Sequence, residues 1–249
     1  MAPPRRVRTP TVPRRPPLAR RLTTAARWPV GVALTSWAYM WRTTPFHRRE
    51  EAGALEADAP PDLPPAVSAK EVQYASDGAG PLFHRRYVAL VREPRLSPEE
   101  LIAAVAGDLN KVTPTEFAVF QKVHGTDEGM EVGDEYVVRM AAPWDGPVRV
   151  VHRTRRSFRF ATLDGHLEAG QIEFRAAPDP AGLRFEIESW ARSGDRLSNL
   201  LYHKLRMAKE IQLHMWTSFL ERVAKASGGR LTGGIEIHTR RVEHRADEA

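Results

Sequence analysis

Between residues 87 and 191 the chain repeats short apolar stretches that are separated by turn residues. The stretches are rich in Val, Ile, Phe and Tyr and often alternate apolar with polar positions, which is typical of β-strands. After residue 123 the segments between these stretches mostly contain Gly, Pro or Asp and are too short for a crossover helix. The strands that they connect should therefore run antiparallel. We expect strands over residues 87–91, 117–123, 135–140, 148–152, 157–163, 169–175 and 183–191.

Two helices are expected around these strands. Ser97, followed by Pro98 and two Glu residues, is a typical N-cap for a short helix through residues 101–105. Residues 195–225 contain neither Gly nor Pro, and their apolar residues recur every three or four positions. This pattern predicts an amphipathic helix about 46 Å long, which should end before Gly228 and Gly229.

The order of these elements predicts an α+β fold. A strongly curved antiparallel sheet of seven strands exposes a concave apolar face, and the C-terminal helix is the one element long enough to cover it. This arrangement is a helix-grip fold, and it leaves a cavity between the sheet and the helix.

The order of elements resembles the START/Bet v 1-like (SRPBCC) superfamily of polyketide cyclases and lipid-transfer proteins. A closer resemblance lies in residues 162–170, Thr-Leu-Asp-Gly-His-Leu-Glu-Ala-Gly. This stretch is similar to the Thr-Leu-x-Gly-His-x-Glu-x-Gly motif of an uncharacterised family of bacteria and plants, known as a domain of unknown function. The resemblance covers residues 148–191 clearly and the long helix loosely, and it does not cover the first 80 residues. It implies the fold and leaves the activity open.

Charge divides the chain of 249 residues, whose net charge is +6, into a basic head and an acidic body. Residues 1–49 contain 11 Arg and no Lys, Asp or Glu, so the remaining 26 basic and 31 acidic residues give the body a charge of −5. We expect a disordered Arg/Pro-rich arm over residues 1–27, an apolar Trp-rich segment and an acidic Pro-rich linker over 28–69, and the helix-grip domain over 70–249. A basic nucleic-acid-binding domain is disfavoured, because the positive charge lies on the arm.

The segment from Trp28 to Trp41 has no charge and holds three of the six tryptophans. It is too short to span a bilayer as a helix. Two interpretations stay open: the segment docks on the body of the protein, or residues 5–41 contact an anionic membrane surface weakly. The chain has no Cys, which agrees with a cytoplasmic location.

Several polar residues fall on strand or helix faces that otherwise are apolar. If the phenylalanines of the strands face the cavity, strand alternation brings polar side chains to the same surface. The polar candidates for ligand binding are Tyr136, His152, His166, Glu168 and Gln212, and the apolar candidates are Phe158, Phe160, Phe174, Phe185, Met215 and Phe219. An inward His or Gln near the end of a strand or helix is more often a structural group that is hydrogen-bonded to the backbone.

These candidates support three hypotheses of function. The first is binding of a small or medium hydrophobic molecule, lipid-like or polyketide-like, without a cofactor. The second is an enzyme on the same scaffold, with His166 and Glu168 as acid and base. His152 could join them in a two-histidine, one-carboxylate metal site, but nothing fixes that geometry and no metal is predicted. The third is a membrane-peripheral or interaction protein that acts through residues 5–41. The sequence leaves the ligand and the oligomeric state open.

Overall fold

The computed structural model describes residues 44–126, 129–140, 145–194 and 206–243, without the side chains of 206–211. In this part of the chain nine strands form one sheet, in the order β1-β9-β2-β8-β7-β6-β5-β4-β3. Neighbouring strands are antiparallel, except that β1 and β9 are parallel. The strands are β1 (Phe46–Ala52), β2 (Ala79–Arg92), β3 (Ala118–His124), β4 (Glu135–Met140), β5 (Asp145–Arg153), β6 (Ser157–Thr162), β7 (Glu168–Asp179), β8 (Gly182–Ser193) and β9 (Arg230–Val242).

The described helices are α2 (Leu55–Asp58), α3 (Pro98–Gly107) and α5 (Arg206–Ala226), with short 3-10 turns η1 (Ala75–Asp77) and η2 (Leu109–Lys111). As expected, Ser97 is the N-cap of α3, and its hydroxyl accepts a hydrogen bond from the Glu100 backbone N–H at 3.3 Å. After α5 the chain turns at Gly228, where φ is +76°. A positive φ favours glycine because it has no Cβ.

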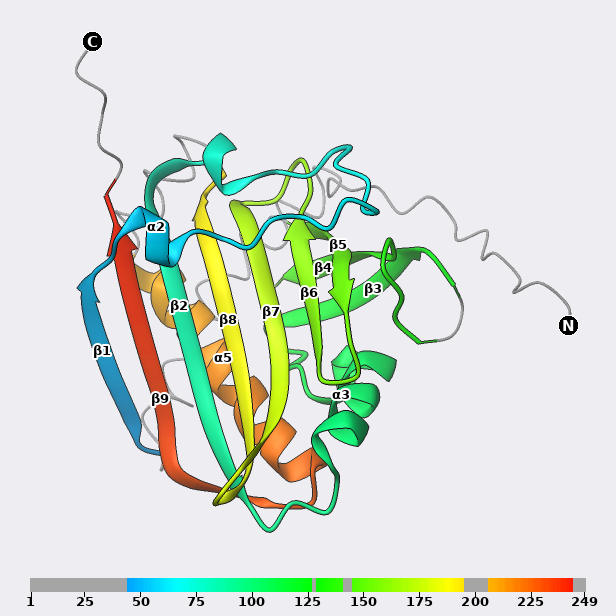
Figure 1. Ribbon diagram of the computed structural model, residues 1–249, viewed down its shortest axis with the longest axis vertical. Helices are drawn as coiled ribbons and strands as arrows, with labels where there is room; N and C mark the ends of the chain where they lie inside the picture. The colour runs from blue at the N-terminus through cyan, green and yellow to red at the C-terminus, as the bar shows by residue number, and fades with distance from the viewer. Residues whose placement is uncertain (1–43, 127–128, 141–144, 195–205, 244–249) are drawn as a thin grey trace, which may run out of the picture.

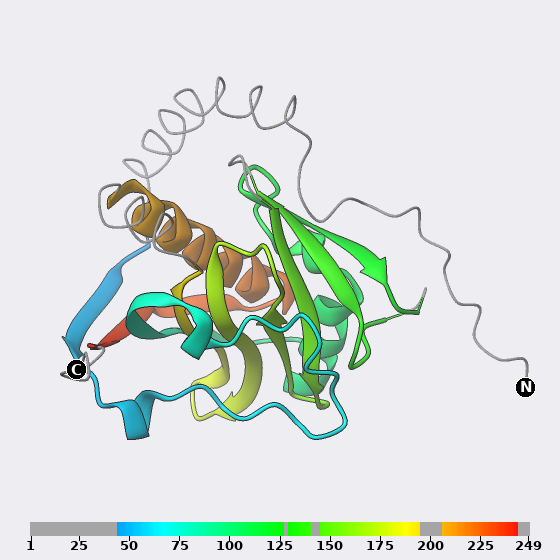
Figure 2. The same ribbon diagram turned by 90° about the horizontal axis from the view of Figure 1, so that it is seen from above.

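The helix-grip prediction is confirmed by the seven strands from β2 to β8 and by α5. Figures 1 and 2 show the sheet curving around α5, which covers one face, here called the inner face. The linker before β2 runs over the opposite, outer face. Residues 195–205, which we expected to form the first turns of the long helix, lie outside the described residues.

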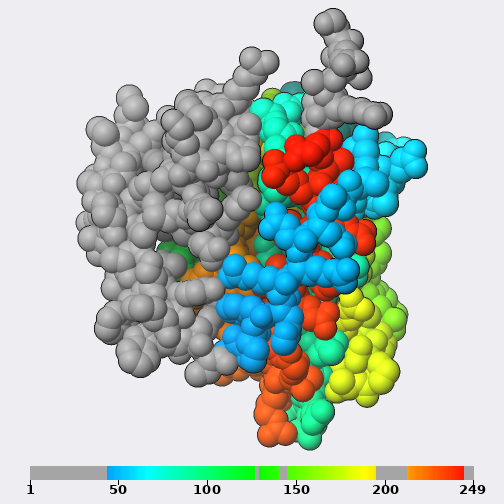
Figure 3. Space-filling view, turned by 90° about the vertical axis from the view of Figure 1, so that its left-hand side faces the viewer, coloured from blue at the N-terminus to red at the C-terminus, as the bar shows by residue number. Residues whose placement is uncertain are grey.

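The sheet has two strands more than the seven we expected. The first, β9, follows α5 and lies between β1 and β2. The second, β1, has the sequence FHRREEA and lacks the apolar alternation by which the other strands were predicted. It is an edge strand, and charged residues are common on such edges because they discourage pairing with other chains. Figure 3 looks at this edge, with β1 in blue in front of β9 in red and orange.

The acidic, Pro-rich segment packs against the outer face of the domain that we expected to begin at residue 70. Three outer-face side chains donate hydrogen bonds to its backbone carbonyls. Gln171 bonds to Pro61 at 2.7 Å, Arg159 bonds to Asp62 at 3.2 Å, and Arg149 bonds to Ser68 at 2.9 Å. A proline has no N–H but keeps its carbonyl as an acceptor, so a Pro-rich chain can lie against donors on a sheet. The expected arm, 1–27, and the segment 28–41 lie outside the described residues.

The core fills the gap between α5 and the sheet along the second half of the helix. Phe158 and Phe174 stack with their ring centroids 4.8 Å apart, and Phe174 also contacts Trp216 at 5.6 Å and Phe219 at 5.4 Å. The phenylalanines with at most 1% of their surface exposed are Phe158, Phe160, Phe174, Phe185 and Phe219. The open cavity expected from the sequence is therefore closed by aromatic rings in this part of the grip.

Among the described residues no helix is long and apolar enough to span a membrane.

Candidate functional site

The inner face of the sheet becomes polar at the end where the described part of α5 begins. We call five residues there the polar belt: Arg85 of β2, Glu168 of β7, Ser189 of β8, Gln212 of α5 and Thr239 of β9. Arg85 lies opposite Ser189 across one neighbouring strand and opposite Thr239 across the other. Arg85 and Ser189 are each only 6% exposed, so a charged group and a hydroxyl are held inside the grip.

Gln212 connects the belt between helix and sheet. Its amide nitrogen donates to both carboxylate oxygens of Glu168 at 3.2 Å, and its amide oxygen accepts from Arg85 at 3.4 Å. Both residues had been predicted for the site, whereas Arg85 was not. Strand alternation could have indicated Arg85, because it lies on β2 midway between Phe83 and Tyr87, which are both buried on the inner face.

His166 lies in the turn between β6 and β7 as a structural group. Its Nδ1 lies 2.9 Å from the backbone nitrogen and 3.0 Å from the backbone oxygen of Glu168, so this nitrogen has a backbone partner in either tautomer of the ring. Nε2 lies against Gly146, where an added Cβ would be 2.7 Å away. The ring therefore bonds to the backbone of Glu168, while the Glu168 carboxylate bonds to Gln212.

We predict that His166 titrates below the ordinary histidine pKa of 6.5. Burial lowers its pKa by disfavouring the charged ring, and the nearby Glu168 carboxylate only partly opposes this effect. An NMR pH titration of the ring, assigned by comparison with His166→Gln, would check this. A midpoint above 6.5 would show that the ring is positioned as a charged partner of Glu168.

The prediction that His152 faces the grip is wrong, because β5 contains a bulge. The register between β5 and β6 passes from Val150 opposite Phe160 to His152 opposite Arg159. One extra residue moves the following side chains to the other face, so His152 lies on the outer side with Arg159. It therefore cannot join His166 and Glu168, and no three metal-ligating side chains gather anywhere in the described residues.

The other candidates lie on the inner side as expected. Tyr136 is buried, burial raises the pKa of its hydroxyl, and its ring meets that of Phe160 edge to face with centroids 5.7 Å apart. Met215 is partly buried against the core. Phe158, Phe160, Phe174, Phe185 and Phe219 belong to the packed core, and their role as ligand contacts stays a prediction.

Trp216 carries a feature that the sequence did not predict. The residue is 7% exposed and lies one helical turn beyond Gln212. Its indole Nε1–H is buried and has no hydrogen-bond acceptor among the described residues. Buried tryptophan N–H groups usually have a partner, so this donor stands out among the buried polar groups of the described residues.

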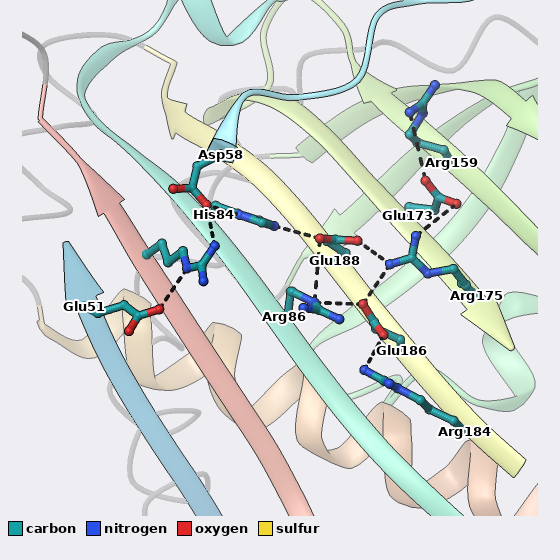
Figure 4. A network of polar contacts seen from close by, with 11 residues as sticks. Glu51, Asp58, His84, Arg86, Arg159, Glu173, Arg175, Arg184, Glu186 and Glu188 are labelled. Atoms are coloured by element: carbon teal, nitrogen blue, oxygen red, sulfur yellow. Dashed lines mark hydrogen bonds and ion pairs between the residues drawn. The ribbon is translucent and has the colours of Figure 1, made fainter. Parts of the chain in front are cut away.

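A second polar system crosses the outer face, and no part of it was predicted. Figure 4 shows ion pairs and hydrogen bonds that run from β1 to β6 over the face opposite α5. We call this the charge ladder. Its members are Glu51, Asp58, His84, Arg86, Arg159, Glu173, Arg175, Arg184, Glu186, Glu188 and Arg240.

His84 lies at the centre of the charge ladder. Its Nδ1 is 2.7 Å from the Asp58 carboxylate and its Nε2 is 2.8 Å from that of Glu188, so both contacts can form when the ring is protonated. Burial alone would lower the His84 pKa, but the bonds to Glu188 and Asp58 outweigh it and raise the pKa. The ring also stacks on Trp190 with centroids 5.3 Å apart. His84 thereby fastens α2 to the outer face of the sheet.

The chain is similar to the solved structure of the KanY protein, with 12% sequence identity, a TM-score of 0.42, and coverage of 61% of this chain and 99% of that one. It is also similar to norcoclaurine synthase from Thalictrum flavum, with 9% identity, a TM-score of 0.42, and coverage of 66% of this chain and 96% of that one. A third similar structure is Ara h 8.0201, with 10% identity, a TM-score of 0.39, and coverage of 58% of this chain and 97% of that one. At these values the likeness adds nothing to what the strand order already shows. No curated protein matches the chain.

The match to a family model is more informative. The model described as "Domain of unknown function (DUF1990)" matches residues 68–222, which is more than half of the chain. The matched range begins in the segment that lies on the outer face and ends within α5. It therefore includes β2 to β8, four of the five residues of the polar belt, Trp216 and His84. The chain belongs to the family of the domain of unknown function DUF1990.

Proposed function

We propose that this protein binds a small ligand in the grip, between the polar belt and Trp216, and that the ligand has an apolar body and a hydrogen-bond acceptor. The buried Trp216 N–H supports this most, since no described residue accepts from it. Leaving such a donor unpaired costs about 1–3 kcal/mol. A carbonyl, hydroxyl or sulfonate oxygen of a ligand would remove this cost.

The packing of the core limits where the ligand can lie. The aromatic rings around Phe174 occupy the gap beside the second half of α5, so the ligand belongs at the other end, near Gln212 and Met215. Sites for small molecules combine apolar walls with a few placed polar groups. The polar belt would supply those groups, and Trp216 would form the floor of the site.

Ligand binding is favoured over catalysis by the contacts of His166. Its Nδ1 is held by the backbone of Glu168 and its Nε2 lies against Gly146, while the Glu168 carboxylate bonds to Gln212, so the two groups are not arranged as an acid–base pair. The hypothesis of membrane contact concerns residues 5–41. These residues lie outside the described part of the chain, so this hypothesis stays a prediction. The expected cytoplasmic location likewise stays a prediction.

The proposal is tested with the fluorescent probe anilinonaphthalene sulfonate, which has an apolar body and an acceptor group. We expect saturable binding to the full chain and at least a tenfold weaker affinity for Trp216→Phe. A tenfold change corresponds to about 1.4 kcal/mol, in the range expected for one hydrogen bond to a charged acceptor.

The matched control is Trp190→Phe, because Trp190 lies on the outer face against His84. It should bind the probe as the wild type does. Equal affinities for the wild type and Trp216→Phe would contradict the proposal, and so would an equal loss in both variants.

A further inference from the structure

A small pocket lies on the outer face, on the side of the sheet away from the grip. Its volume is about 80 Å³, far below the roughly 300 Å³ of a typical site for a drug-sized molecule. Strand register brings its walls together, because His84 and Arg86 of β2 lie opposite Arg240 and His238 of β9. The polar residues that line it are His84, Arg86, Arg184, Glu236, His238 and Arg240.

The three arginines of this pocket have donors that no described residue uses. Arg86 bonds to Glu186 only through its Nε, at 2.9 Å. Arg184 contacts Glu186 through Nη2 at 3.0 Å. Arg240 uses Nε toward Glu51 and Nη1 toward Asp58. Within the described part of the chain, at least one terminal nitrogen of each guanidinium therefore has no protein acceptor.

The Nε–H of Arg184 gives independent support. This atom is buried from solvent and has no acceptor among the described residues. A buried unpaired donor that belongs to a charged group is costly. Arg184 therefore carries an unsatisfied donor in addition to the groups with which it lines the pocket.

The charge around the pocket is positive on its β8 side. The guanidinium groups of Arg86, Arg175 and Arg184 all contact the single carboxylate of Glu186. Figure 4 shows Arg86 and Arg184 reaching toward this carboxylate from either side. The contacts to Arg86 and Arg175 outweigh burial and lower the pKa of Glu186, so it stays charged. Glu188 also contacts Arg86, at 3.7 Å, and Arg175. Three guanidinium groups therefore face two carboxylates, which leaves one positive charge for a further anion.

We propose that this pocket binds a phosphate-type oxyanion, either free or as the terminal group of a larger molecule. The fork of N–H donors on a guanidinium matches the spacing of phosphate oxygens. The volume fits one such group, and the rest of a larger ligand would extend over the open part of the outer face. This site is separate from the grip, because the sheet lies between the two.

The test uses inorganic phosphate and, in a second series, vesicles of phosphatidylcholine with and without phosphatidic acid. By calorimetry at constant ionic strength, we expect saturable phosphate binding that is at least tenfold weaker in Arg184→Gln. Glu186 keeps Arg86 and Arg175 in this variant, so the fold should persist, and the melting temperature checks this. Binding to the vesicles that depends on phosphatidic acid and on Arg184 would identify a lipid headgroup as the source.

The matched control is Arg230→Gln, which removes the same charge outside the pocket from a side chain that is 76% exposed. It should bind phosphate within twofold of the wild type. Absence of saturable binding in both series would overturn the proposal, as would an equal loss in Arg184→Gln and Arg230→Gln. Neither result would affect the grip, since the probe experiment above reports on the opposite face.

Discussion

Replacing Phe174 by Ala is expected to lower the free energy of unfolding by about 4 kcal/mol, the middle of the range for a buried Phe. The side chain is fully buried, and it contacts rings from the neighbouring strand β6 and from α5. Truncation leaves a cavity that the surrounding rings cannot fill without leaving their own contacts. Urea unfolding followed by circular dichroism would measure the loss.

The control for this change is Val119→Ala on β3, where Val119 is 38% exposed. It should cost less than about 0.5 kcal/mol, as is usual for a surface position. A loss of less than about 1 kcal/mol in Phe174→Ala would contradict the closed aromatic core. It would mean that the gap between α5 and the sheet is loosely filled along its whole length.

Replacing His84 by Gln is expected to destabilise the fold by about 3 kcal/mol at pH 6. Removing one partner of a buried ion pair leaves a buried charge without compensation, which costs about 3–5 kcal/mol. We expect a loss at the lower end of this range, because neither carboxylate is left without a partner. Asp58 keeps its hydrogen bonds to the Ala54 N–H and to Arg240, and Glu188 keeps its ion pair with Arg175. His238→Gln is the matched control, since this histidine is 44% exposed and 3.8 Å from Glu236.

The effect of His84 should depend on pH in a defined direction. Its pKa is raised above the ordinary 6.5, so its stabilisation is complete below pH 6.5 and is lost as pH rises through the folded value. The pKa values of Asp58 and Glu188 are lowered from 3.8 and 4.5, so their stabilisation is lost as pH falls through the folded values. The contacts of His84 in the charge ladder should therefore add most to the free energy of unfolding of the wild type between about pH 4.5 and 6.5.

Unfolding curves from pH 4 to 9 would test this dependence. The difference in stability between the wild type and His84→Gln should be largest in the mildly acidic range and shrink toward pH 9. A difference that is the same at pH 6 and pH 9 would contradict a charged His84 held between two carboxylates.

The inner face could be predicted from the sequence because it obeys strand alternation. Phe158, Phe160, Phe174 and Phe185 lie at alternate positions, and all of them reach the core as expected. The same rule failed for His152, because a bulge in β5 shifts the register by one residue. No residue type in this stretch indicates that bulge from the sequence. Gln212 stood out because it interrupts an apolar helical stripe.

The outer face could not be predicted in the same way. Charged residues at alternate positions of β2 and β8 ordinarily indicate a solvated surface. The burial of His84 depends on a segment far away in the sequence, residues 53–78, which brings Asp58 to it. Likewise β1 has no strand pattern of its own and forms because β9 offers an unpaired edge. Such features come from long-range contacts, which composition and periodicity do not encode.

The most direct test of ligand binding in the grip is the indole N–H resonance of Trp216. In a proton–nitrogen correlation spectrum it is identified as the peak that is absent from Trp216→Phe. On addition of anilinonaphthalene sulfonate we expect this peak to move downfield, as a hydrogen bond forms at Nε1, while the peak of Trp190 stays in place. A Trp216 peak that does not move at saturating probe, or that moves only together with that of Trp190, would contradict a ligand site between the polar belt and Trp216.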